Sequence, residues 1–470
     1  MLCGGRRRNY LFVVGTARIT QCHACGLVSR TGSGAAPALT SYQLDPQTAG
    51  ALLAWLPKGR ILQLIQKSGA LPRGDGRDFV TVDMSAGPAG PFEPRAFDAV
   101  FVNGVVEHVA DPVSLLRSAR AALKPGGALL VIASSGDVSR ARTDQLPLHS
   151  FSPSTLLRLA QTAGFRGEAC GIVERNSESP VADERLVEPS PPSWPIRAMG
   201  RLLGKPLEVP SGLLELRATA GELRDQPKLS IIMPVFNEAK TFLRTFQKVY
   251  DVPLEGIDRE LIIVESNSSD GSRELVRSVE HLPGVRALYE DRPSGKGHAV
   301  RAGMAVADGD VLLIQDADDE YDVTDYDIVL QPLLRLSATF VLGSRHMGGR
   351  TWKIRQFANA PLVAGVMNLA HQLLTALVNW LYQADMRDPT TMYKVFRREA
   401  VRGIDFRRDR FDFDFELVCK LIRRGHIPVE VPINYRSRSY AEGKKVRFFR
   451  DPITWVRTIV ASRFETLVVR

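Results

Sequence analysis

Eleven residues, DVLLIQDADDE at positions 310–320, constrain the fold of this chain most strongly. An apolar run of the kind that forms a buried strand stops abruptly at four carboxylates. Burying Asp316 and Asp318 without partners would cost several kcal/mol each, so a cation must meet them at the end of the strand. A divalent metal that carries the diphosphate of a sugar nucleotide fits this need, because hard cations take oxygen ligands from carboxylates and phosphates.

The composition is that of a soluble globular protein, with 470 residues of which 44% are hydrophobic and 24% are charged. This length is enough for about two or three domains. The formal charge of +9 suggests an anionic partner, such as a membrane surface, a nucleotide or a nucleic acid, although a solubilising surface charge would give the same sum. The basic residues form no stripe interleaved with aromatic residues, so a nucleic acid ranks low among these partners.

Cysteine content and hydropathy favour a cytoplasmic location. The five cysteines are too few and too scattered for a disulfide framework, which fits a reducing cytosol. No secretory signal stands out behind the basic triplet at positions 6–8. The segment 358–382 comes closest to a membrane span, but five polar residues interrupt it. A span needs roughly 20 predominantly apolar residues, so this segment is expected to be amphipathic.

Prolines cluster between residues 177 and 226, where the regular alternation of apolar and polar segments is lost. We expect a linker with short docked helices in this range. On both sides of it, short β-branched runs alternate with segments of helical period, which is typical of α/β domains. The sequence therefore predicts two Rossmann-like α/β domains, at residues 41–176 and 227–470, with a small segment at 1–40 ahead of them.

Polar turns follow the strands of the second domain. The strand at 229–233 ends in one such turn, and the strand at 260–264 leads into a loop in which Asp270 or Ser272 is placed to cap the next helix. The sequence GKG at 295–297 opens a helix, where backbone N–H groups and an ammonium suit a phosphate. Ligands of open α/β sheets sit outside the carboxyl ends of the strands, so these turns can converge on one crevice.

Six motifs follow one another in this domain: PVFNE at 234–238, DGS at 270–272, GKG at 295–297, DAD at 316–318, GSR at 343–345 and DPTTMYKVF at 388–396. In this order they resemble a family 2 glycosyltransferase with the GT-A fold, in the branch of dolichyl-phosphate mannosyltransferase and bacterial polyprenyl-phosphate sugar transferases. The resemblance runs from about residue 229 to residue 464, and the sequence YAEGKK at 440–445 fits the same branch.

The resemblance implies a role for each matching position. Asp316 and Asp318 resemble the metal-binding pair of the family, with Glu320 in the third position, for Mg²⁺ or Mn²⁺. Asp319 is an extra acid that can tune the choice of metal. Glu265 stands where many relatives have an aspartate that contacts the base. The expected donor site comprises Pro234, Phe236, Asn237, Glu238, Glu265, Asp270, Lys296 and Asp316.

The implied reaction makes demands on charge. The leaving nucleoside diphosphate gains charge as the glycosidic bond breaks, and a divalent ion and Lys296 would stabilise that charge. Attack from the opposite face would invert the anomeric centre. A lipid-phosphate acceptor is already anionic and needs cations for positioning, whereas a hydroxyl acceptor needs a base, for which Asp388 and Glu416 are the candidates. The candidate cations are Arg345, Arg436, Arg438, Lys444 and Lys445.

Several of these residues have plainer explanations. Asp270 can act only as a helix cap, and Arg345 and Arg438 can pair with surface acids. The lysine pair at 444–445 fits a solvated run of charge. Asp388 precedes a proline and fits a turn.

The sequence allows two structural interpretations for each of three segments. The strict alternation of FDFDFE at 411–416 is compatible with a half-buried strand or with a helix start that packs its aromatic residues. The segments 358–382 and 451–469 have the pattern of amphipathic helices with cationic flanks, which lie in membrane interfaces. Core packing or a dimer surface would use the same pattern.

The first domain has a second set of motifs. The segment 97–112 reads as a strand followed by a helix entry, 123–132 as a turn followed by a strand, and Phe151-Ser152-Pro153 opens a helix. From about residue 59 to residue 173 this order resembles a class I S-adenosylmethionine-dependent methyltransferase. The pair Glu107-His108 belongs to the strand–helix junction of that resemblance more readily than to a metal site.

This domain departs from the methyltransferase pattern at the cofactor loop. Relatives carry an acid and then a glycine-rich loop after the first strand, whereas this chain has Gln63 in the acid position and only Gly69 of the glycines. Side chains at Ile65 and Lys67 would occupy the space that the cofactor needs. Asp83 could still meet a ribose. We therefore expect a degenerate domain that does not bind S-adenosylmethionine.

Ahead of this domain, CHACGLV at 22–28 resembles one knuckle of a small zinc ribbon. A structural zinc takes four ligands. Cys22 and Cys25 would be two of them, Cys3 offers a third and His23 a poor fourth. Three ordinary cysteines without a metal are the alternative.

Together these features predict an inverting, metal-dependent glycosyltransferase in cell-envelope glycan biosynthesis. It would act at the cytoplasmic face of the membrane, with a nucleotide-sugar donor and a polyprenyl-phosphate or glycan acceptor. The alternatives are a bifunctional enzyme with an active methyltransferase half, and a scaffold in polysaccharide assembly.

Overall fold

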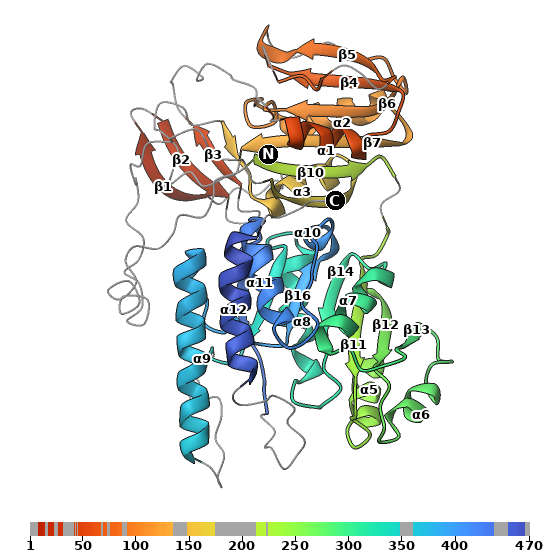
Figure 1. The fold of residues 1–470 in the computed structure, drawn as a ribbon. Helices are drawn as coiled ribbons and strands as arrows, with labels where there is room; N and C mark the ends of the chain where they lie inside the picture. Colours follow the sequence, from red (N-terminus) through yellow and green to blue (C-terminus); the bar gives the residue numbers. More distant parts are fainter. Residues whose placement is uncertain are drawn as a thin grey trace.

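The computed structural model describes most of the chain (Figure 1). The described residues are 8–14, 17–22, 27–31, 42, 44, 46–66, 69–72, 76–86, 92–134, 148–173, 213–221, 224–347, 361–436 and 450–465. They form three sheets, and the larger two are each mainly parallel. The predicted α/β class with two sheet-centred domains is confirmed.

A small antiparallel sheet begins the chain, in the order β1-β2-β3-β8. Cys22 ends the second strand and is buried, and its N–H donates to the carbonyl of Leu27 at 2.9 Å. Cys3, His23 and Cys25 lie outside the described residues, so the expected zinc site gains no support from the structure. The strands are β1 (Arg8–Val14), β2 (Ala17–Cys22), β3 (Val28–Thr31) and β8 (His149–Ser150).

The first large sheet has the order β5-β4-β6-β7-β10-β9, with parallel pairing from β5 to β7. The side chains of β4 and β6 are almost all buried, which matches the continuous apolar runs of parallel strands. The strands are β4 (Arg60–Ile65), β5 (Asp78–Asp83), β6 (Phe97–Asn103), β7 (Leu123–Ser134), β9 (Arg166–Val173) and β10 (Leu213–Thr219). The helices are α1 (Pro46–Trp55), α2 (Pro112–Ala122) and α3 (Pro153–Thr162), with a short 3₁₀ helix at Met84–Ala86.

Strand β10 differs from the linker expected at 177–226. It pairs antiparallel with both β7 and β9, so residues 213–219 belong to the first sheet. Alternating leucines made this segment able to join a sheet. Its charged residues Glu215 and Arg217 are both buried, and they form an ion pair with each other that compensates their burial. The rest of the expected linker up to residue 212 lies outside the described residues.

The second large sheet has the order β13-β12-β11-β14-β16-β15-β17. Strands β11 to β14 are parallel, and β16 is antiparallel to both of its neighbours. The strands are β11 (Lys228–Val235), β12 (Asp258–Glu265), β13 (Val285–Tyr289), β14 (Val311–Ile314), β15 (Phe340–Ser344), β16 (Lys394–Arg397) and β17 (Val429–Pro432). The helices are α5 (Phe242–Asp251), α6 (Ser272–Arg277), α7 (Lys296–Val306), α8 (Tyr326–Leu334), α9 (Pro361–Tyr382), α10 (Arg398–Val401), α11 (Phe413–Arg423) and α12 (Arg450–Phe464), with a 3₁₀ turn at Val323–Asp325.

The alternating segment 411–416 begins helix α11 and is no strand. Phe413 and Phe415 are both buried, and Phe413 packs edge-on against Phe406, so the aromatic residues serve the core at a helix start.

Helices α9 and α12 stand next to each other on one side of the second domain (Figure 1). Both leave apolar side chains exposed, including Leu369 and Leu373 on α9 and Ile453 and Phe464 on α12. Among the described helices, none combines the length and the hydropathy that crossing a membrane requires.

Strand β9 of the first domain docks against the second domain. The N–H of Ile172 donates to the carbonyl of Arg424 at 2.8 Å, and the ring of His426 bonds the carbonyl of Cys170 at 2.8 Å. Gly171 permits this approach, because a Cβ there would lie 2.6 Å from the Arg424 side chain. The two domains are therefore joined through the backbone of an edge strand as well as through the chain.

Candidate active site

A cavity of about 820 Å³ lies at the carboxyl ends of β11, β12 and β14. Its polar side comes from the turns after these strands and from the start of α7, and its apolar side from helices α9, α11 and α12. Its lining includes eight of the residues singled out from the sequence: Pro234, Phe236, Glu238, Lys296, Asp316, Asp318, Glu320 and Arg345.

The turn after β11 is held in place by the loop after β12. Asn237 has φ +50°, its N–H donates to Ser268 Oγ at 2.9 Å, and its Oδ1 accepts from the N–H of Ser269 at 2.9 Å. Asp270 accepts from the N–H groups of Ala239 and Ser272, both at 3.0 Å. Asn237 and Asp270 therefore tie the two turns together, whereas Pro234 and its neighbours face the cavity.

The electrostatics of Asp270 reflect these bonds. Burial alone would raise the pKa of its carboxyl, but hydrogen bonds from Ser272 and Ala239 outweigh burial and lower that pKa. At neutral pH, Asp270 is thus a carboxylate that links the two loops through its hydrogen bonds.

Glu265 does not occupy the position expected of a residue that contacts the base of the nucleotide. Its side chain is fully buried, accepts from the N–H groups of Asn267 and Ser268 at 3.2 and 2.7 Å, and lies 3.2 Å from Arg273. It does not line the cavity, whereas its neighbour Ser266 does. A glutamate is long enough to fold back onto its own loop, and here it shapes that loop.

The three expected metal ligands all line the cavity. Asp316 forms an ion pair with Lys296, Asp318 accepts from the N–H of Glu320 at 3.2 Å, and Glu320 accepts from the hydroxyl of Tyr435 at 2.9 Å. Three carboxylates on one wall form the oxygen-rich donor set that Mg²⁺ and Mn²⁺ take, so the residues fit such an ion.

Asp319 does not belong to this wall. Its φ of +60° turns the chain, and its carboxylate pairs with Lys248 at 2.6 Å and Arg244 at 3.0 Å. It is absent from the cavity lining, which contradicts the expectation that it tunes the choice of metal.

Lys296 stands at the first position of α7, behind Gly295 with φ +111°. Burial would lower the pKa of its ammonium, but the negative charges of Asp316 and Asp414 outweigh burial and raise that pKa. The ammonium therefore stays charged inside the cavity.

Arg345 and Asp388 form a buried, two-pronged ion pair. The Nε and Nη2 atoms of Arg345 each donate to one carboxylate oxygen at 2.7 Å, and its backbone N–H donates at 3.0 Å. Burial would raise the pKa of Asp388, but the guanidinium holds it well below its usual range. Because these donors bond both of its oxygens and its pKa is so low, Asp388 is unsuited to be the general base that the sequence suggested.

Glu416 is unsuited to that role as well. It is fully buried, accepts from the N–H groups of Arg407 and Arg408 at 2.9 Å each, and pairs with Lys420 at 2.6 Å. It lies outside the cavity lining and fixes the loop before α11.

Sequence reasoning missed Asp414 and His371. Asp414 lies in the first turn of α11, lines the cavity and stands 3.5 Å from the ammonium of Lys394. A helical reading of 411–416 would have separated Asp414 from Asp412 and Glu416, since residues two apart point in different directions on a helix. His371 lines the cavity from α9, and no sequence signal marked it.

The structure describes only some of the basic residues that were expected to bind the acceptor. Arg436 is exposed, lies outside the cavity lining, and its N–H donates to the carbonyl of Glu320 at 2.9 Å. Arg438, Lys444 and Lys445 lie outside the described residues. Arg345 is thus the expected acceptor cation that the structure places on the cavity.

The equivalent edge of the first sheet is filled by the chain itself. Gln63 is buried and accepts from the N–H of Leu71 at 2.8 Å. The amide of Asn103 donates to the carbonyls of Tyr42 and Gly69, both at 2.9 Å. Asp83 accepts from the N–H of Ser85 at 2.8 Å. Ile65 is buried, and Lys67 lies outside the described residues.

The comparisons with known proteins agree with this division. Residues 230–404 match the family model "Glycosyl transferase family 2", and residues 62–131 match the model "Methyltransferase domain". The dolichol-phosphate mannosyltransferase of Pyrococcus furiosus is 23% identical over 219 residues, which cover 46% of this chain and 59% of that protein. The chain thus spans little more than half of this relative.

Two further relatives are similar. The dolichyl-phosphate beta-glucosyltransferase of Dictyostelium discoideum is 28% identical over 266 residues, or 52% of this chain and 76% of that protein. The crystal structure of glucosyl-3-phosphoglycerate synthase from Mycobacterium tuberculosis with UDP has a TM-score of 0.38 and 19% identity, and covers 50% of this chain and 80% of its own. By these family models, residues 230–404 of this chain are similar to family 2 glycosyltransferases, and the region before them is similar to methyltransferase domains.

Proposed function

We propose that this protein transfers a sugar, with inversion, from a nucleotide-diphosphate sugar to a polyprenyl phosphate at the cytoplasmic face of a membrane. One observation carries the proposal. A single cavity joins three carboxylates, the ammonium of Lys296 and the guanidinium of Arg345 to an apolar wall built by α9, α11 and α12. A nucleotide sugar requires the polar side, and a lipid acceptor requires both sides.

The donor would occupy the polar side. Asp316, Asp318 and Glu320 would hold Mg²⁺ or Mn²⁺, which when bound stabilises charge on a diphosphate. Lys296 stands at a helix start with its charge maintained, so it can neutralise a phosphate oxygen as the leaving group departs. Phe236, which is partly exposed in the cavity wall, offers a surface for the base.

The hydrogen bonds of Asp388 and Glu416 support a phosphate as the acceptor. Asp388 and Glu416 have their oxygens occupied by donors, so neither can remove a proton from a hydroxyl. An anionic phosphate needs no such base and needs only a cation to position it. Arg345 supplies that cation, and Asp388 fixes its orientation from behind.

The apolar wall supports a lipid acceptor. Val366, Ala370 and Leu374 of α9 line the cavity, and Leu369 and Leu373 of the same helix are exposed on an adjacent flank, outside the lining. Helix α9 can thus face a bilayer interface with one side and a prenyl chain with the other. Both relatives named above carry dolichol or dolichyl phosphate in their names.

A donor screen tests the proposal. The purified chain, vesicles with polyprenyl phosphate, and UDP- and GDP-sugars are incubated with Mn²⁺ or Mg²⁺, and the lipid product is identified by mass spectrometry. We expect a glycosyl-phosphoryl lipid that requires the metal. Transfer only to a soluble hydroxyl acceptor would refute the lipid acceptor, and in that case Asp414 would be the first base to test, by Asp414→Asn.

We propose further that the methyltransferase-like domain does not bind S-adenosylmethionine. Gln63 accepts from the N–H of Leu71, Asp83 accepts from the N–H of Ser85, and Asn103 donates to the carbonyl of Tyr42, so these polar side chains are bonded to the chain's own backbone. Calorimetric titration with S-adenosylmethionine is expected to give no saturable heat. Saturable binding would favour the bifunctional enzyme, whereas no binding together with capture of pathway partners by the intact chain would favour an additional scaffold role.

A further inference from the structure

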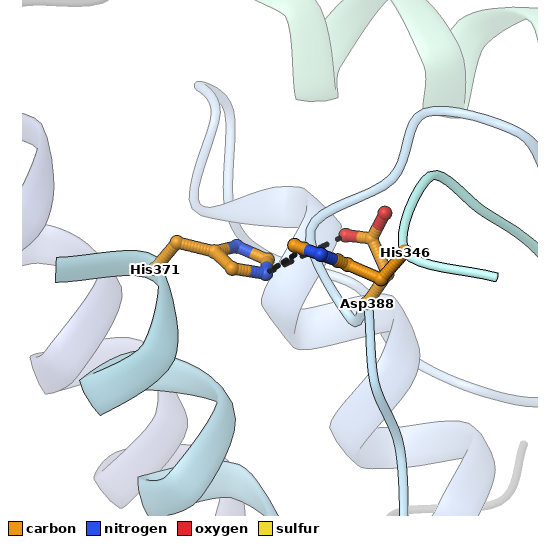
Figure 2. Close-up of side chains that lie close together, drawn as sticks. All are labelled: His346, His371 and Asp388. Carbon is orange, nitrogen blue, oxygen red and sulfur yellow. Dashed lines mark hydrogen bonds and ion pairs between the residues drawn. The ribbon is translucent and has the colours of Figure 1, made fainter. Parts of the chain in front are cut away.

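Two histidines and an aspartate converge beside α9 (Figure 2), and one of them, His371, lines the cavity. His346 follows β15, His371 projects from α9, and Asp388 lies in the loop before β16. The two Nε2 atoms are 2.8 Å apart, His371 Nε2 is 4.0 Å from Asp388 Oδ1, and all three ligand atoms lie within 4.8 Å of one another. The proposed glycosyl transfer uses neither histidine.

Thr390 orients His371 within this cluster. Its hydroxyl oxygen accepts from Arg345 Nη2 at 2.7 Å and lies 3.0 Å from His371 Nδ1 and 3.2 Å from Asp388 Oδ1. When the Thr390 proton points to Asp388, Nδ1 of His371 must carry a hydrogen and donate it to Thr390. The lone pair of Nε2 then faces His346 and Asp388. Histidine ligands of metals are held in this way, with the second ring nitrogen bonded to a neighbour.

The distances suit a first-row divalent ion after small movements. Bond lengths of about 2.0–2.2 Å place neighbouring ligand atoms roughly 3.0–3.5 Å apart. The observed separations of 2.8 and 4.0 Å bracket this range. Asp388 Oδ1 already accepts from Arg345 Nη2 at 2.7 Å and from Thr390 at 3.2 Å, so it would join the ion by exchanging the longer of these two bonds, the one from Thr390.

We propose that His346, His371 and Asp388 form a second metal site, selective for ions such as Zn²⁺, Co²⁺ or Ni²⁺. Imidazole nitrogen favours these ions, whereas the all-carboxylate set of Asp316, Asp318 and Glu320 favours Mg²⁺ and Mn²⁺. Three protein ligands leave at least one position open. His371, Arg345 and Thr390 line the cavity, so that position faces the space where an anionic ligand would bind.

Charge sets a limit on the affinity of this site. The cluster carries one carboxylate, and that carboxylate already compensates the guanidinium of Arg345. A dication therefore adds net positive charge in a buried place, which raises its cost and favours an anion as the additional ligand. We expect a site of moderate affinity, which goes beyond the proposed function and does not depend on it.

Zinc titration by calorimetry tests the site. The protein carries no histidine tag and contains Asp318→Ala, Cys22→Ser and Cys25→Ser, so that the carboxylate wall and the cysteine knuckle do not contribute. The expected result is one equivalent of Zn²⁺, bound at least about tenfold more weakly after His371→Ala or His346→Ala. His281→Ala is the matched control, since His281 is exposed and distant in sequence, and it should leave binding unchanged.

Two additional measurements keep the test decisive. Thr390→Val removes the partner of Nδ1 and is expected to weaken Zn²⁺ about 10–100-fold while keeping all three ligands. Zn²⁺ should raise the melting temperature of the parent and not that of His346→Ala, whose partly exposed position makes misfolding a lesser risk. Absence of Zn²⁺ binding by the parent, or equal binding by parent and both histidine variants, overturns the proposal and leaves a hydrogen-bonded histidine pair.

Discussion

The two large sheets present the carboxyl ends of their parallel strands differently. In the first sheet, Gln63 within β4 and Asn103 at the end of β6 form hydrogen bonds with the backbone of nearby loops, so the edge is closed by the chain itself. In the second sheet, Asp316 and Asp318 follow a buried strand and line a cavity of about 820 Å³. The same α/β architecture can therefore have a sheet edge whose polar groups are bonded by the chain itself, or an edge that opens into a cavity.

The difference lies in what satisfies the polar groups. An amide at a strand end both donates and accepts, so it can be saturated by backbone groups without a ligand. A carboxylate accepts only, and a cluster of carboxylates needs cations. The cavity of the second sheet is lined by five acids and by the cations Lys296, Arg345 and Arg410, whereas Gln63 and Asn103 in the first sheet are neutral amides bonded to backbone groups.

The largest effect is expected at the ion pair behind the cavity. Arg345→Ala leaves the Asp388 carboxylate buried without its main partner, and such losses cost about 3–5 kcal/mol. Urea denaturation near neutral pH measures the change in the free energy of unfolding. Arg387 is exposed and directly precedes Asp388, so Arg387→Ala is the control. This variant should change the free energy of unfolding by less than about 0.5 kcal/mol. Equal stability of Arg345→Ala and wild type would show that the pair is not formed.

The same pair makes stability depend on pH. The pKa of Asp388 is lowered in the folded protein, so its contribution is fully present above the ordinary carboxyl pKa of about 3.9 and is lost as the pH falls below that value toward the folded pKa. Wild type should therefore lose stability on acidification more steeply than Asp388→Asn. Parallel pH profiles of the two proteins would contradict this assignment.

The next effect concerns activity. Asp318→Asn removes one ligand of the proposed metal and is expected to lower sugar transfer about 100-fold or more, at the scale of losing one electrostatic contact in a transition state. Asp319→Asn, one residue along the chain, is the matched control. Its side chain pairs with Arg244 and Lys248 outside the cavity, so transfer should change less than about twofold. Similar losses in both variants would indicate a general effect on the loop.

The short motifs that directly follow strands were predictable from sequence, because a polar turn after a buried strand can only lie at the sheet edge. DAD at 316–318 reaches the cavity for this reason, close behind β14, whereas GKG at 295–297 reaches it at the start of α7. The surroundings of the carboxylates were not predictable. Asp388 and Glu416 read as possible bases, but a buried guanidinium and two backbone N–H groups, placed by tertiary packing, occupy their oxygens.

Two other features were also beyond local patterns. Strand β10 follows a proline-rich segment of the sequence. It contains the charged residues Glu215 and Arg217, so its sequence did not indicate a strand of a buried sheet. His371 reaches the cavity because α9 packs beside α12 and α11, which depends on contacts across about 90 residues of sequence.

A smaller effect tests the closed edge of the first sheet. Gln63→Leu keeps the volume of the side chain but leaves the N–H of Leu71 buried without its acceptor, which costs about 1–3 kcal/mol. Thermal and urea unfolding of the whole chain would show the loss, with sugar transfer unchanged below the melting temperature. If Gln63→Leu unfolds like wild type, water reaches the N–H of Leu71 and the edge of the first sheet is not closed.

The smallest effect concerns the outer side of α9. The exposed large hydrophobic side chains among the described residues all belong to the second domain, and Leu369 and Leu373 are 53% and 55% exposed. If they enter a bilayer interface, Leu369→Ser or Leu373→Ser should weaken binding to anionic vesicles by about 1 kcal/mol each, since only part of each side chain is transferred from water. Vesicle co-sedimentation measures this, with Ile328→Ser on α8, 40% exposed, as the control. Equal losses in all three variants would assign the binding to general hydrophobicity, and no loss in the α9 variants would remove this helix from the membrane-facing surface.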